Sequence, residues 1–164
     1  MKSKVFTAFY LTLGKLSSSL ERKISEKRLK FASQELLYNK KYCVAIYHNV
    51  TINYSDNTLS INTYIDNFYE KIKLLNKYFN IITFDVLKTL KQENLVKPPL
   101  IITFDDIYEG VYSNAYPILK DFGLKAILSL SPFFIEKRKY FWWDVIFDYL
   151  NHYLWYLIYL LSVQ

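Results

Sequence analysis

Residues 100–106 read Leu-Ile-Ile-Thr-Phe-Asp-Asp, and this stretch decides the fold. Apolar and β-branched residues run without a break from Leu100 to Phe104, and Pro98-Pro99 interrupts the chain just before them. Such a run predicts a strand that is buried on both faces, as the strands of parallel sheets are. Asp105 and Asp106 then stand at the carboxyl end of this strand, the edge at which α/β proteins bind their ligands.

Three further apolar runs predict strands on either side of this one. They lie at residues 42–48 (YCVAIYH), 81–84 (IITF) and 124–130 (LKAILSL). Cys43, the single cysteine of the chain, falls inside the first run. One thiol forms neither a disulfide framework nor a cysteine-built zinc site, so we expect Cys43 to be a small buried core residue.

Helices are expected between these strands. Apolar residues spaced three and four apart predict helices at 61–79 and 111–122, and a short helix is expected at 86–90. The candidate end signals of these helices are Ser60 or Asn62, Asp85 and Gly123. Strands that alternate with helices indicate an α/β domain with a parallel sheet.

The first 41 residues form a basic leader. They hold ten Lys/Arg and three Asp/Glu, a net charge of +7, whereas residues 42–164 carry a net charge of −1. The apolar face of an amphipathic helix is predicted from Val5, Phe9, Leu13, Leu16, Leu20 and Ile24. Such a helix either docks on the body of the protein or lies, through residues 1–30, on an anionic membrane surface. A cytoplasmic or inner-membrane location is favoured without excluding export, because no small-x-small cleavage site follows.

The composition fits one globular domain and excludes several function classes. Apolar residues make up 52% of the 164 residues, which is ample for a core. The three glycines, Gly14, Gly110 and Gly123, cannot form a glycine-rich phosphate loop, so Rossmann and P-loop sites are excluded. Outside the leader no basic patch is interleaved with aromatic residues, so no nucleic-acid partner is expected.

Paired carboxylates at the end of a strand can support metal-assisted hydrolysis. One carboxylate can bind a divalent metal ion while the other accepts a proton from the water that the metal polarises. The metal also offsets the repulsion between two like charges held this close. The alternative is that Asp105 caps the following helix and Asp106 is simply solvated.

The residues around the aspartate pair resemble the polysaccharide deacetylases, the NodB-homology group, over about residues 42–150. The resemblance rests on Ile102-Thr103-Phe104-Asp105-Asp106, Tyr108, residues 114–120 (NAYPILK), residues 46–50 (IYHNV), residues 123–126 (GLKA) and residues 141–144 (FWWD). It implies a distorted (β/α) barrel that hydrolyses the N-acetyl amide of N-acetylated polysaccharides or oligosaccharides with a divalent metal, usually zinc. It also implies that Asp105 is the general base and Asp106 a metal ligand, with His48 and Tyr108 as possible lining of the active site.

Three departures from the family pattern stand out. Ile107 replaces the glycine that usually follows the aspartate pair, and a β-branched residue is strained if that position needs a positive φ. The His-x-x-x-His motif that supplies two metal ligands is missing, since the two histidines, His48 and His152, lie 104 positions apart. A catalytic zinc site generally needs three protein ligands. The later arginine-bearing and histidine-bearing motifs of the family are missing as well.

We therefore expect an incomplete barrel with about four strands and no activity of its own. The expected organisation is a leader helix at 1–41, a partial deacetylase-like domain at 42–152 and an apolar tail at 153–164. Residues 142–152 are expected to be helical, and the uninterrupted apolar part of the tail is too short to span a bilayer. The contrasting hypothesis is a non-catalytic remnant that serves as a membrane-associated or partner-binding module.

The sequence allows two roles for His48 and two roles for the tryptophans Trp142 and Trp143. His48 is either an inward-facing residue near the mouth of the barrel or a core histidine bonded to the backbone. Trp142 and Trp143 either stack on sugar rings or belong to the core, and their spacing beside Phe141 and Phe147 favours the core.

Overall fold

The computed structural model describes residues 19–52, 61–91, 95–106, 108–132, 141–146, 149–150 and 153, with side chains from residue 23 onward. The chain divides between Ser129 and Leu130 into two compact units, and each is described by itself. The leader segment 1–18, Ile107, His152 and the tail beyond residue 153 lie outside the described residues. The expectations placed on them stay predictions.

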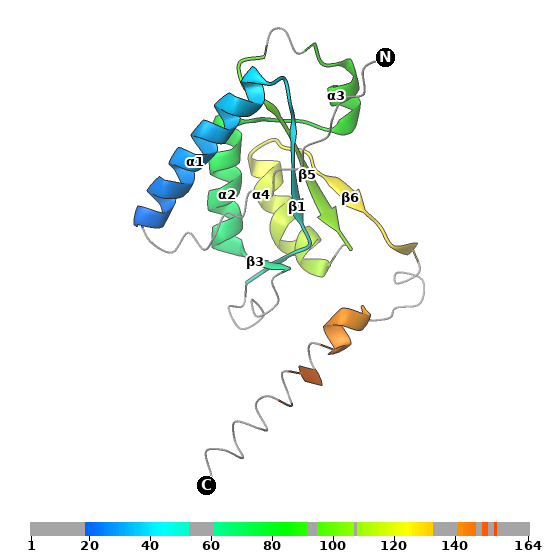
Figure 1. The fold of residues 1–164 in the computed structure, drawn as a ribbon. Coiled ribbons are helices and arrows are strands. Elements are labelled where there is room, and N and C mark those ends of the chain that lie inside the picture. The colour runs from blue at the N-terminus through cyan, green and yellow to red at the C-terminus, as the bar shows by residue number, and fades with distance from the viewer. Residues whose placement is uncertain are drawn as a thin grey trace. The chain divides into compact units, whose positions relative to one another are not determined.

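The first unit is built on a parallel sheet whose centre is β5 (Pro99–Asp105). Strand β1 (Cys43–Tyr47) runs along one edge of β5, with Cys43 opposite Leu100 and Tyr47 opposite Phe104. Strand β4 (Asn80–Ile81) pairs with the first residues of β5, and β6 (Ile127–Ser129) with its last residues. This confirms the predicted parallel α/β sheet (Figure 1). Among the described strands the sheet is open, and they form no closed barrel.

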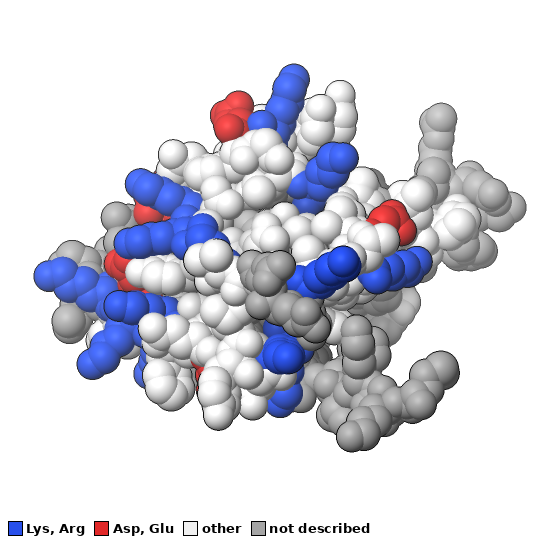
Figure 2. Space-filling model, turned by 90° about the horizontal axis from the view of Figure 1, so that it is seen from above, with Lys and Arg blue, Asp and Glu red and all other residues white. Residues whose placement is uncertain are grey.

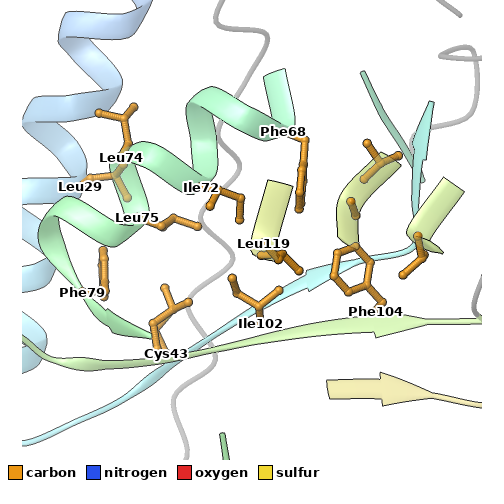
Figure 3. Close-up of a cluster of buried hydrophobic side chains, with 14 of the residues drawn as sticks. Leu29, Cys43, Phe68, Ile72, Leu74, Leu75, Phe79, Ile102, Phe104 and Leu119 are labelled. Atoms are coloured by element: carbon orange, nitrogen blue, oxygen red, sulfur yellow. The ribbon is translucent and has the colours of Figure 1, made fainter. Parts of the chain in front are cut away.

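Helices cover one face of this sheet. Helix α2 (Ile65–Tyr78) and the short α4 (Tyr116–Asp121) contribute side chains that meet those of the strands, as Figure 3 shows. The shared core is made of Phe68, Ile72, Leu75, Phe79, Leu119, Cys43, Leu100, Ile102 and Phe104. Cys43 is thereby confirmed as a buried core residue.

Aromatic packing fixes the carboxyl end of β1 against that of β5. The Tyr47 ring meets Phe68 edge to face, with ring centroids 5.1 Å apart, and lies 5.7 Å from the ring of Phe104. Burial among these rings raises the pKa of the Tyr47 phenol, because its ionised form would lose solvation. The strand register and the ring contacts therefore both place Tyr47 beside Phe104 at this end of the sheet.

Helix α1 (Ser19–Tyr38) lies alongside α2 (Figure 1). Leu29 and Leu36 are buried in the shared core, so this part of the predicted leader docks on the body of the protein. Ile24 was expected on the apolar face of the helix, but 45% of its surface is exposed. The buried face of α1 differs from the predicted apolar face. Leu29, Ser33 and Leu36 point toward the body of the protein, and Ile24 lies on the opposite side of the helix.

Two predicted helix starts were wrong. Asn62 belongs to strand β3 (Asn62–Tyr64), which pairs in parallel with β2 (Asn49–Thr51), and Tyr64 is the N-cap of α2. The Asn62 Oδ1 atom accepts a hydrogen bond from Asn49 Nδ2 at 3.0 Å, so its side chain serves strand pairing instead of capping.

The next helix, α3 (Phe84–Thr89), begins earlier than expected. Its N-cap is Thr83, whereas Asp85 lies in the first turn. A carboxylate there still interacts favourably with the positive end of the helix dipole. The strand expected at 81–84 is correspondingly short, because Phe84 already belongs to α3.

The predicted helix at 111–122 exists in two pieces. A π-helical turn, η3 (Val111–Ala115), comes first, and α4 continues it. Pro117 has no N–H to donate to residue 113, so the regular α-helical ladder cannot run through this point. Gly123, with φ of 65°, ends the helix as predicted. Its N–H donates to the Lys120 oxygen and the Leu124 N–H to the Leu119 oxygen.

In the second unit, residues 142–146 are helical, as the sequence indicated. Trp142 was expected in the core but is exposed, while the Trp143 ring stacks on Phe141 with centroids 4.8 Å apart. Ile146, Tyr149 and Leu150 are exposed as well. No helix in the described part of the chain is long and apolar enough to cross a membrane.

Candidate functional site

Asp105 is the last residue of β5, so its carboxylate stands at the carboxyl edge of the central strand. Side chains alternate between the two faces of a strand. Leu100, Ile102 and Phe104 enter the helix-covered core, which places Asp105 on the opposite face of the sheet. The Asp105 side chain is partly exposed there. This is the position expected of a ligand-facing carboxylate at a parallel sheet edge.

The alternative role for Asp105, capping the next helix, does not agree with the structure. The N-cap of η3 is Gly110, and no side chain caps it. Helix η3 therefore begins several residues beyond the aspartate pair.

Asp106 adopts a left-handed backbone conformation, with φ of 65°. A positive φ is uncommon outside glycine, although aspartate tolerates it better than most residues. The turn after β5 is thus made at Asp106 itself.

His48 lies at the same edge of the sheet as Asp105. It follows Tyr47, whose register partner on β5 is Phe104, so His48 is level with Asp105 on the neighbouring strand. His48 is partly exposed, and its imidazole has no hydrogen-bond partner among the described residues. Partial exposure places His48 outside the buried core, and its role as possible lining of the active site stays a prediction.

Tyr108 lies in the link between the aspartate pair and η3. Its main-chain oxygen accepts a hydrogen bond from the Val111 N–H at 2.9 Å, which begins the helical segment. The structure thus brings Asp105 and His48 to one edge. Tyr108 follows that edge along the chain, and its role as active-site lining stays a prediction.

Sequence reasoning missed a polar cluster that holds this link in place. Asn114 Nδ2 donates a hydrogen bond of 2.7 Å to the main-chain oxygen of Val50 on β2. A Cβ atom at Gly110 would collide with that same oxygen and with Asn49 Oδ1. Gly110 and Asn114 therefore pack the start of η3 directly on β2. The signal in the sequence was an isolated glycine followed by an asparagine four residues later, close behind the aspartate pair.

Asn49 joins β2, β3 and η3 at this cluster. Its Nδ2 atom bonds Asn62, while its Oδ1 atom is buried without a hydrogen-bond partner and faces Gly110. Glycine leaves room for that amide oxygen, which no larger residue could do. The cluster fixes the direction in which the chain leaves Asp106.

The donor set at this edge does not fit a complete catalytic metal site. Among the described residues no group of three His, Cys, Asp or Glu side chains comes together. Asp105 and Asp106 are adjacent in sequence, and His48 is the nearby imidazole by register. A catalytic zinc usually has three protein ligands with one open position. The described residues thus fall short of the metal centre that the resemblance implies.

No protein-family model matches the sequence, and no curated protein matches it either. Solved structures of deacetylases do match about half of the chain. A Streptococcus pyogenes deacetylase in complex with acetate has 22% identity and a TM-score of 0.46, covering 53% of this chain and 41% of that one. A de-N-acetylase from Aggregatibacter actinomycetemcomitans has 21% identity and a TM-score of 0.44, with 53% and 36% covered.

A polysaccharide deacetylase from Bacillus cereus also matches, with 23% identity and a TM-score of 0.42, covering 54% of this chain and 28% of that one. The chain therefore spans less than half the length of each of these three proteins.

Proposed function

We propose that this chain is polysaccharide-deacetylase-like and that the carboxyl edge of β5 is its contribution to a deacetylase site. The observation that carries the proposal is the position of Asp105 at the end of the central parallel strand, on the face away from the helices. The substrate class is an N-acetylated polysaccharide or oligosaccharide, in line with the sequence motif at 102–106.

Asp105 is assigned the role of general base. A carboxylate that is partly exposed at the sheet edge can accept a proton from the water that attacks the carbonyl carbon of the N-acetyl group. The carbon–oxygen bond then forms, the carbon–nitrogen bond breaks, and the leaving nitrogen takes up the proton that Asp105 accepted, which gives acetic acid and a free amine. Asp106, which lies in the left-handed turn directly after β5, is assigned to the divalent metal of the family.

A bound divalent metal would activate water and stabilise the developing oxyanion. The described residues do not complete a site for it, so no step is derived through the metal. We expect the chain by itself to have negligible activity for the same reason. Turnover would need metal ligands beyond Asp106.

The test measures acetate release from N-acetylglucosamine oligomers with added zinc. The full chain, its Asp105→Asn variant and an enzyme-free blank should give the same rate. Turnover by the full chain that is lost in Asp105→Asn would refute the expected inactivity, but it would support the assignment of Asp105 as the general base. Turnover that survives in Asp105→Asn would refute the site itself.

The coding sequence offers a second test. A His-x-x-x-His codon pattern in another frame soon after residue 152 supports an interrupted deacetylase. Joining it in frame to this chain should then give zinc-dependent acetate release that Asp105→Asn abolishes. If that joined protein folds and stays inactive, the deacetylase assignment is refuted.

A membrane-associated module is the second candidate function, and one observation favours it. The outward face of α1 carries exposed apolar residues, with exposed cations nearby on the same helix.

A further inference from the structure

Helix α1 is fixed to the body of the protein through one face. Leu29 and Leu36 are buried in the shared core. On the same side, Glu26 Oε1 accepts hydrogen bonds from Lys77 Nζ at 2.6 Å and from the Tyr78 hydroxyl at 2.8 Å, both at the end of α2. These contacts hold α1 on the body of the protein and do not involve the opposite face of the helix.

That opposite face carries a line of exposed apolar side chains. Ile24 is 45% exposed, Phe31 70% and Tyr38 89%. They recur every seven residues, which is close to two helical turns, and so they line up along the helix over about 21 Å. Leu29 and Leu36 have the same spacing on the buried side. We call Ile24, Phe31 and Tyr38 the outer line of α1.

Cations flank the outer line. Those with exposed side chains are Lys23, Lys27, Arg28 and Lys30. Among the side chains of this helix that the structure describes, Glu26 is engaged with Lys77 and Glu35 is exposed nearby, so acidic residues offset these four cations in part. Figure 2 shows Lys and Arg side chains, with some Asp and Glu among them, on the side of the molecule where Figure 1 places α1, and further Lys and Arg elsewhere on this face. The surface is therefore apolar along its centre, with cations beside its N-terminal half, from Lys23 to Lys30, and Glu35 beside its C-terminal half.

This combination fits the interface of an anionic lipid bilayer. Apolar side chains enter the boundary between headgroups and acyl chains, while lysine and arginine stems lie along the surface and place their charges among lipid phosphates. A soluble protein partner would need an acidic rim around an apolar groove to match the same pattern. We propose that α1 lies flat on an anionic membrane surface through its outer line, with the rest of the domain held on the solvent side.

The test measures partitioning of the full chain onto vesicles that contain phosphatidylglycerol and onto vesicles of phosphatidylcholine alone. We expect binding to the first kind only, and binding that weakens as salt is added. Phe31→Ser should weaken binding roughly tenfold, because a buried phenyl ring contributes about 1.5–3 kcal/mol. Lys27→Gln and Lys30→Gln should each weaken it about fivefold, since a cation near an anionic surface contributes about 1 kcal/mol.

Matched control variants distinguish binding through this surface from non-specific binding of the protein to vesicles. Val96→Ser removes an apolar side chain that is 88% exposed outside α1, and Lys88→Gln and Lys125→Gln remove exposed cations elsewhere. These three should leave vesicle binding unchanged. All the substituted side chains are exposed, and circular dichroism verifies that each variant folds.

Several results would overturn the proposal. Equal binding to both kinds of vesicle, no binding to either, or binding unaffected by Phe31→Ser would each do so. A Phe31→Ser variant that instead changes a self-associated chain into a monomer would show that the outer line is a protein interface. None of these results depends on deacetylase activity, so the proposed function and this inference stand or fall separately.

Discussion

The side-chain amide of Asn114 donates a hydrogen bond of 2.7 Å to the main-chain oxygen of Val50, although the two residues lie 64 positions apart. Val50 belongs to β2, directly after the strand that carries His48 to the sheet edge, and Asn114 lies in the helical turn that follows Asp105 and Asp106. One bond therefore ties together the two chain segments that leave the candidate site.

Removing this bond should destabilise the domain. Asn114→Ala leaves the partly buried oxygen of Val50 without its side-chain donor, which costs about 1–3 kcal/mol. Urea unfolding monitored by circular dichroism measures the loss. Ser113→Ala is the matched control, because the Ser113 hydroxyl is exposed and bonds only the Glu109 oxygen of its own turn. Equal stability of Asn114→Ala and Ser113→Ala would contradict the anchoring role.

Substitution of Gly110 or of Gly123 by alanine should destabilise the fold, for a different reason at each position. At Gly110, φ is −61°, but a Cβ atom would collide with the Val50 main-chain oxygen, so overpacking costs about 1–3 kcal/mol. At Gly123 the space is open, but φ is 65°, which costs an L-residue about 1–2 kcal/mol. Asparagine should therefore be tolerated better than alanine at Gly123 and no better at Gly110. The same ranking at both sites in urea unfolding would refute this distinction.

The backbone conformation of Asp106 and its charge should have separable effects on the stability of the fold. Asp106→Gly should stabilise the fold by about 0.5–1 kcal/mol, because glycine adopts a positive φ without strain. Asp106→Val should destabilise it, since a β-branched residue is strained in that region. Asp106→Asn keeps the backbone preference and removes the charge, so it reports the electrostatic part alone. Greater stability of Asp106→Val than of Asp106→Asn would contradict the observed turn.

The parallel sheet could be predicted because its strands are apolar on both faces. Residues 100–104 and 42–48 gave β5 and β1 nearly to the residue. Short elements were harder to predict. Asn62 and Asp85 had the right chemistry for helix caps, but Asn62 pairs with Asn49 across two strands, and such distant partners leave no local signal.

The candidate site was predictable to the same limited extent. The edge position of Asp105 followed from the strand pattern, and the register added His48 beside it. The sequence raised a positive φ only as a condition at Ile107, which lies outside the described residues, and it did not predict the positive φ of Asp106. Gly110 and Asn114 act through contacts with β2, which only the folded chain brings within reach.

The thiol of Cys43 should be unreactive in the folded protein. It is 2% exposed, and burial raises its pKa to about 11, so very little thiolate exists at neutral pH. Labelling with a thiol-specific reagent should follow unfolding and accelerate along the urea transition. Rapid labelling without denaturant would show that β1 opens readily at its first residue.

Stability should depend on pH through the contact between Glu26 and Lys77. The hydrogen bond from Lys77, and next that from Tyr78, hold the pKa of Glu26 below its ordinary value, and Glu26 in turn raises the pKa of Lys77. A lowered carboxyl pKa stabilises the fold above the unfolded-state value and loses that effect as pH falls through the folded-state value. Glu26→Gln should therefore shift the urea midpoint downward at neutral pH, and the shift should vanish in acid.

The size of this shift should be small and dependent on salt, because the Lys77 side chain is 60% exposed and that of Glu26 33%. Glu35→Gln changes an exposed carboxylate on the same helix and serves as the control. Midpoints are compared for both variants at neutral and acidic pH. If the two variants lose stability equally and with the same pH profile, net charge on α1 and not the bond to Lys77 accounts for the effect.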